Sequence, residues 1–149
     1  MYDHILLASD GTEASTNAES HAIALAAEHG AALHALYVVD EDVYTAYSGD
    51  EYVDESEGPE HGLEEEGEEA LAAVRAAAED AGVDVVETLT HGNPVESIIA
   101  TAEDSDADVI VLGTKRRPAE YRSLLGSVTD RVVRLTARPT VVVKTEVDE

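Results

Sequence analysis

Short runs of Val, Ile and Leu alternate with helical segments along this chain, and that alternation limits the folds it can adopt. The runs at residues 109–112 (VIVL) and 141–143 (VVV) are wholly aliphatic, which is typical of strands buried on both faces of a parallel sheet. We expect five strands, at residues 5–9, 33–39, 83–90, 108–113 and 140–144. Because helical segments separate them, the pattern predicts an α/β fold with a single doubly wound, five-stranded parallel sheet and helices on both faces.

The expected helices have recognisable ends. Asn93 is placed as an N-cap, Pro94 occupies the first helical position, and Glu96 follows at the third. Gly30 and Gly82 are placed to end two other helices. Helices are therefore predicted at residues 13–29, 63–81 and 127–136, with a fourth beginning after Asn93. A chain of 149 residues is long enough for one core, so residues 1–149 are predicted to form one domain.

The composition excludes several classes of protein. With no cysteine, the chain cannot hold disulfides, thiolate zinc sites or a cysteine nucleophile. The six histidines show no metal-ligand spacing. No apolar stretch approaches the roughly 20 residues of a membrane-spanning helix, and the first residues lack the pattern of a signal peptide. We therefore expect a cytoplasmic protein with neither a membrane nor a nucleic acid as partner.

The chain is strongly acidic, with 33 Asp and Glu against nine Lys and Arg and a formal net charge of −24. Repulsion among so many carboxylates is screened within a few ångströms at molar salt. We interpret the acidity as that of a protein from a salt-accumulating halophile. The alternative is an acidic protein that binds a basic partner, but the acids are spread along the chain rather than gathered in one tail. One long acidic segment, from Asp40 to Gly62, is expected to be irregular.

The basic residues, by contrast, are gathered in one segment. Eight of the nine lie between Lys115 and Lys144, where only two acids oppose them, so this segment carries about +6 by simple count. Gly126 and Ser127 open the helix within it, and a helix N-terminus offers free N–H groups to an anion. A serine N-cap is the commoner reading of that pattern. The glycine-rich motifs of P-loop and dinucleotide-binding proteins are absent.

The carboxyl ends of the first and fourth expected strands carry Asp10 and Gly113. If these strands are neighbours, both residues lie at the crevice where doubly wound sheets bind ligands. The position of Asp10 is equally consistent with a structural role in the turn and with contact to a ligand.

Over essentially its whole length the chain resembles the universal stress protein family. The resemblance is carried by the Asp10-Gly11-Thr12 turn, the Tyr37-Val38-Val39-Asp40 end of the second strand and the Gly92-Asn93-Pro94 helix start. The most specific part is formed by residues 111–114, 125–129 and 138–144. Nucleotide-binding members share a Gly-x2-Gly-x9-Gly-Ser/Thr motif, to which Gly113, Gly126 and Ser127 correspond. Arg116 stands at the position of the middle glycine. The Arg116 side chain either occupies the space of the phosphates or binds them through its guanidinium group.

The resemblance implies the strand order 3-2-1-4-5 and an adenine nucleotide, such as ATP, as ligand, with Mg²⁺ as a candidate companion held by Asp10. It implies a nucleotide site made by Ala8, Asp10, Val38, Gly113, Arg116, Gly126, Ser127 and Val128. It also implies a homodimer through the apolar last strand, from Thr140 to Lys144, which would otherwise leave an exposed edge.

We expect a dimeric sensor or regulator of the stress response rather than an enzyme, because no residue is a convincing general base. Two alternatives stay open. One is a slow ATPase, for which Asp10 is the candidate residue. The other is a dimeric interaction module of the same family that does not bind nucleotide.

Overall fold

The computed structural model describes residues 2–9, 13–40, 59–116 and 127–146, which form five strands and four helices. The elements follow one another along the chain as β1 (His4–Ser9), α1 (Glu13–His29), β2 (Ala32–Asp40), α3 (Pro59–Asp80), β3 (Val85–Gly92), α4 (Pro94–Asp104), β4 (Val109–Arg116), α5 (Ser127–Leu135) and β5 (Thr140–Glu146).

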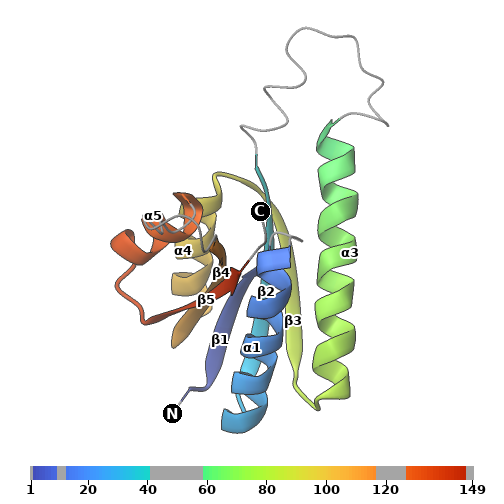
Figure 1. The fold of residues 1–149 in the computed structure, drawn as a ribbon, viewed down its shortest axis with the longest axis vertical. Helices are drawn as coiled ribbons and strands as arrows, with labels where there is room; N and C mark the ends of the chain where they lie inside the picture. Colours follow the sequence, from blue (N-terminus) through green and yellow to red (C-terminus); the bar gives the residue numbers. More distant parts are fainter. Residues whose placement is uncertain (1, 10–12, 41–58, 117–126, 147–149) are drawn as a thin grey trace, which may run out of the picture.

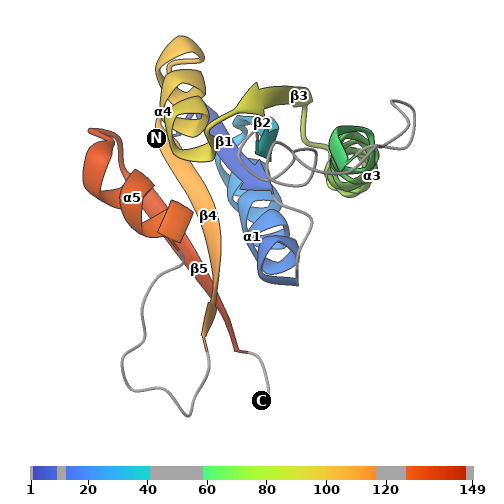
Figure 2. The same ribbon diagram turned by 90° about the horizontal axis from the view of Figure 1, so that it is seen from above.

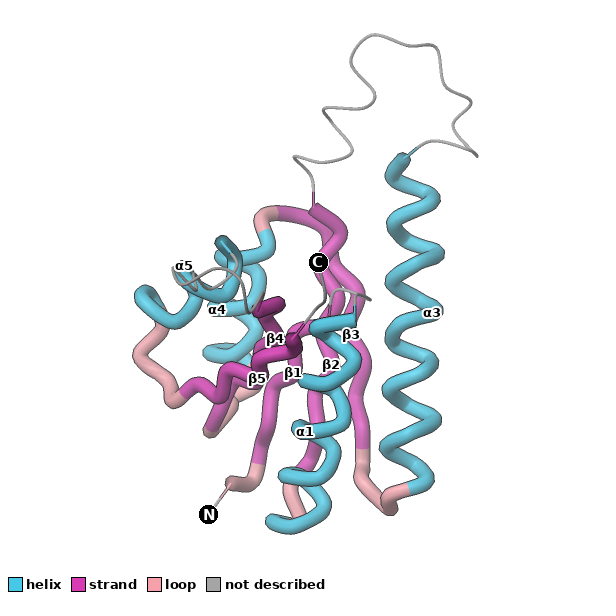
Figure 3. The backbone as a smooth tube through the Cα atoms, in the orientation of Figure 1, coloured by secondary structure: helices cyan, strands magenta, loops and turns pink. Residues whose placement is uncertain are grey.

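The strands form one parallel sheet in the order β3-β2-β1-β4-β5. Helices α1 and α3 cover one face, and α4 and α5 cover the other (Figures 1 and 2). All four strand pairings are parallel, so the carboxyl ends of the strands lie together at one end of the sheet. The tube view shows the strands side by side between the helices (Figure 3). The predicted fold class and strand order are confirmed. Among the described residues, no helix is both long and apolar enough to cross a bilayer.

A separate hydrophobic core lies on each face of the sheet. On the first face, Leu33 and Val111 pack with α1 and α3. The alanines of α1 at positions 18, 22 and 26 are fully buried against the sheet. Their small side chains allow the helix to lie close to the strands. On the second face, Leu36 and Ile110 pack with Ile98 of α4 and Val132 of α5. Fully burying one such Leu or Ile side chain contributes about 1.5–3 kcal/mol.

The predicted boundaries hold to within a few residues. Helix α1 has the predicted bounds, and α3 begins four residues before the predicted residue 63. The side chain of Asn93 accepts a hydrogen bond from the Glu96 N–H at 3.1 Å, which confirms the predicted N-cap of α4. Strand β4 continues to Arg116, three residues beyond the predicted end.

The expectation that residues 141–143 are buried on both faces is wrong. These valines are only half-buried, because β5 lies at one edge of the sheet. Strand β3, at the other edge, is likewise half-buried along most of its length, and Val86 on it is 58% exposed. A run of β-branched residues signals a strand, but its place in the sheet depends on pairing with distant segments.

The Asp108 carboxylate ties the start of β1 to the start of β4. One of its oxygens accepts the backbone N–H groups of Asp3 at 2.7 Å and His4 at 2.9 Å. These two backbone hydrogen bonds lower the pKa of Asp108 below its ordinary value of 3.8, and the bond from Asp3 has the larger effect. A carboxyl whose pKa is lower in the folded chain stabilises the fold above its unfolded pKa, and that stability is lost as the pH falls through the folded pKa.

We therefore expect Asp108→Asn to lower the free energy of unfolding at pH 7, and the difference from the parent chain to shrink as the pH falls below about 4. Urea unfolding at constant KCl, repeated between pH 3 and pH 7, measures it. Asp80→Asn, an exposed acid at the end of α3, is the matched control. A difference that stays constant over this range would contradict the assignment.

Candidate functional site

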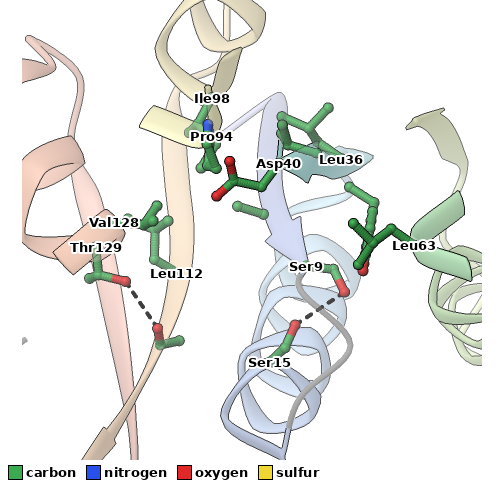
Figure 4. A pocket seen from close by; sticks show the side chains of 14 residues that line it. Ser9, Ser15, Leu36, Asp40, Leu63, Pro94, Ile98, Leu112, Val128 and Thr129 are labelled. Carbon is green, nitrogen blue, oxygen red and sulfur yellow. Dashed lines mark hydrogen bonds between the residues drawn. The ribbon is translucent and has the colours of Figure 1, made fainter. Parts of the chain in front are cut away.

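A cavity of about 270 Å³ opens at the carboxyl ends of β1, β2 and β4, between α3, α4 and α5 (Figure 4). Strand β1 pairs with β2 on one side and β4 on the other, so the chain reverses its winding direction at this point. Doubly wound sheets bind ligands at such a crevice. The described residues that line it are Ala8, Ser9, Ser15, Leu36, Tyr37, Val38, Asp40, Leu63, Pro94, Ile98, Leu112, Gly113, Val128 and Thr129.

The wall on the α4 and α5 side is mainly apolar. Leu36 and Val38 of β2 belong to the same hydrophobic cluster as Ile98 of α4. Leu112 of β4 lies beside Val128 of α5 (Figure 4). Such a wall suits a flat, weakly polar ring. Asp40, the last residue of β2, adds a carboxylate to this wall.

The wall on the α1 side is polar. The Ser9 hydroxyl donates to Glu19 Oε2 at 2.8 Å, and the Ser15 hydroxyl lies 3.1 Å from Ser9 Oγ and 3.2 Å from the same Glu19 oxygen. Ser9 and Ser15 are 6% and 3% exposed. These bonds satisfy two buried hydroxyls at the base of the cavity, so the cluster stabilises the junction between β1 and α1.

The first turn of α5 is held against β4 by a side-chain bond. Thr129 Oγ1 donates to the carbonyl oxygen of Gly113 at 3.0 Å (Figure 4). Helix α5 begins at Ser127, so its N-terminal end is placed at the cavity, where Val128 and Thr129 form part of the lining. A helix N-terminus at a cavity favours an anionic group there.

The structure brings four of the eight predicted site residues together. Ala8, Val38, Gly113 and Val128 all line the cavity, from three strands and one helix. Ser127 and Arg116 are placed by their backbones alone, at the start of α5 and the end of β4. Strand conformation at Arg116 is extended, which any residue adopts, so an arginine there brings no backbone strain. Asp10, Gly126 and most of the acidic segment, at residues 41–58, lie outside the described residues.

Sequence reasoning missed Asp40, the serine pair and Thr129 as lining residues. Asp40 could have been found, because it directly follows the predicted strand at residues 33–39 and therefore lies at the carboxyl end of that strand. Ser15 and Thr129 could not, since only the packing of their helices turns them toward the cavity. The described residues contain no group of three or more His, Asp or Glu that could hold a metal ion.

The fold and the cavity define a doubly wound α/β domain with a ligand crevice at its switch point. The family model of the Universal stress protein family matches residues 1–144, so the chain belongs to this family. The universal stress protein MJ0531 of Methanocaldococcus jannaschii is 37% identical over 147 residues, which span 97% of this chain and 83% of that relative.

Three solved structures share the fold. The structure of protein MJ0577, from the same organism, has a TM-score of 0.75 at 27% identity and covers 97% of each chain. A universal stress protein in complex with cAMP has a TM-score of 0.65 at 20% identity, covering 96% of this chain and 97% of that chain. One from Archaeoglobus fulgidus in complex with dAMP has a TM-score of 0.67 at 19% identity, covering 96% of this chain and 98% of that one.

Proposed function

We propose that this chain binds an adenine nucleotide in the cavity at the carboxyl ends of β1, β2 and β4, and that it acts as a regulator in the stress response. The observation that carries the proposal is the cavity itself, which combines an apolar wall for a ring with a helix N-terminus for an anion. Family membership and the nucleotide complexes of two proteins of the same fold support it.

The residues present fit such a ligand. Val38 and Ala8 provide apolar contact for the base, and Gly113 leaves space beside the first turn of α5 for the ribose and phosphate. Ser127 and Gly126 are the proposed phosphate contacts, and the surrounding segment carries most of the positive charge of the chain. Asp10 is proposed to hold Mg²⁺ when the nucleotide is a triphosphate, since carboxylates are the side chains that Mg²⁺ prefers.

Calorimetric titration of the protein with AMP, ADP and ATP in molar KCl tests the proposal. We expect saturable binding of at least one of them, at one site per chain. No heat of binding with any of the three at millimolar concentration would contradict it and would favour the alternative of an interaction module without nucleotide.

We propose a regulatory rather than an enzymatic role. The support for this is that the two buried serines of the cavity already donate within the protein: Ser9 to Glu19, and Ser15 to Ser9 and Glu19. Hydroxyls bound in this way serve the packing of β1 against α1 rather than proton transfer to a ligand. Steady-state ATP turnover that is lost in Asp10→Ala would overturn this and favour the slow ATPase.

We also propose a homodimer through β5. This strand is half-buried over residues 140–143 and lies at the sheet edge, where an unpaired strand invites pairing. Light scattering in molar KCl at micromolar concentration is expected to give twice the chain mass of 15.8 kDa, and the mass of a monomer would contradict the proposal.

The acidity of the chain is proposed to be an adaptation to high salt. At 1 M salt the screening length is about 3 Å, so the carboxylates no longer repel one another across the surface. The thermal midpoint of unfolding is therefore expected to rise between 0.1 and 2 M KCl. A midpoint that does not change over this range would contradict the interpretation.

A further inference from the structure

Asp40 is the one carboxylate among the described residues that line the cavity. It is the last residue of β2 and lies on the same face of the sheet as Val38, two positions earlier, and Leu36, four positions earlier. Its side chain extends past the end of the strand toward Pro94, in the first turn of α4 (Figure 4). The carboxylate therefore lies at the edge of the apolar wall rather than on the polar α1 side.

The two ends of this apolar wall favour ligand groups of opposite character. At one end, the first turn of α5 beside Gly113 favours a negative group. At the other end, Asp40 can only accept hydrogen bonds, and it repels a negative group or a carbonyl oxygen. A ligand that spans the wall is thus oriented with its anion at α5 and a hydrogen-bond donor at Asp40.

We propose that Asp40 is the residue that sets the specificity of the cavity for the ring of its ligand. Its carboxylate accepts a hydrogen bond from an exocyclic amine on that ring, and it disfavours a ring that carries a carbonyl oxygen at the same position. This inference rests on the proposed nucleotide function. A carboxylate has about four acceptor positions, so it can accept from a ligand in addition to its contacts within the protein.

The test compares AMP with inosine monophosphate, which carries a carbonyl oxygen where adenine carries the amine. The parent chain is expected to bind AMP roughly ten- to a hundredfold more tightly, as a hydrogen bond to a charged group is lost and an acceptor faces a carboxylate. Asp40→Asn presents an amide that both donates and accepts. The preference of that variant is expected to fall to within about threefold, mainly through tighter binding of inosine monophosphate.

Asp104→Asn, which removes the same charge from the exposed far end of α4, is the matched control and is expected to keep the parent preference. Asp40→Ser is a second variant whose side chain is too short to reach the ring, and it is expected to lose the preference through weaker binding of AMP.

The outcomes separate this inference from the proposed function. If the parent chain binds AMP and both Asp40 variants keep its preference over inosine monophosphate, the inference is overturned and the proposed function stands. If the parent chain binds neither nucleotide, the proposed function is overturned and the inference with it. Loss of the preference in the folded Asp40 variants, with the Asp104 control unchanged, supports the inference.

Discussion

Gly67→Val is expected to lower the free energy of unfolding by about 3 kcal/mol, which is large for a single change on a helix. Gly67 lies in α3 where the helix meets β2 and β3. A Cβ atom at this position would lie 2.6 Å from Cδ1 and 2.9 Å from Cε1 of Tyr37, and 2.7 Å from Cδ1 of Leu89. Tyr37 is only 6% exposed and packs with Leu89 in the same core, so a larger side chain at position 67 forces both out of their packed positions.

Gly67→Ala is also expected to destabilise, by about 1 kcal/mol, because strain from overpacking exceeds the gain in helix propensity. The matched control is Gly62→Ala in the same helix, where a Cβ meets nothing within 4 Å. That change is expected to raise stability by roughly 0.5 kcal/mol. Urea unfolding in molar KCl measures all three variants. Equal stabilisation by alanine at both positions would contradict the close packing of α3.

Ser127→Glu is expected to weaken binding of an adenine nucleotide by about a hundredfold, while the fold becomes slightly more stable. Ser127 is the first residue of α5, whose first turn lines the cavity. A carboxylate there takes the favourable interaction with the helix N-terminus for itself and repels the ligand phosphate. The same interaction stabilises the helix by roughly 0.3–1 kcal/mol, so affinity and stability are expected to change in opposite directions.

Calorimetric titration and thermal unfolding measure the two effects on one preparation. Ser127→Ala is the control, because it removes only the hydroxyl, and it is expected to reduce affinity by less than tenfold. An affinity for the glutamate variant within twofold of the parent would place the phosphate elsewhere.

The fold could be predicted from the sequence because each local signal agreed with the others. The aliphatic runs marked the strands, Asn93 marked the start of α4, and Gly30 and Gly82, with φ of 66° and 75°, lie just beyond the ends of α1 and α3. The degree of burial of a strand could not be predicted from its own residues, since the aliphatic run at residues 141–143 forms a half-buried edge strand. The edge position of that strand followed only from the strand order that the family resemblance implies.

The candidate site was only partly predictable. Residues near the strand ends, such as Ala8, Val38 and Gly113, could be found because the carboxyl ends of parallel strands lie together at one end of the sheet. Ser15 and Thr129 reach the cavity only through the rotation of α1 and α5 about their own axes. Ser9 was identified as the end of a strand but not as part of a hydrogen-bonded cluster, since its partner Glu19 lies ten positions further along the chain.

The central claim, that this chain is a nucleotide-binding protein, is tested most directly by what it carries from the cell. The protein is purified in concentrated KCl without added nucleotide and then denatured, and the released small molecules are identified by mass spectrometry. We expect an adenine nucleotide from the parent chain, and much less of it from Ser127→Glu prepared in parallel. A parent chain that releases no adenine nucleotide would contradict the account.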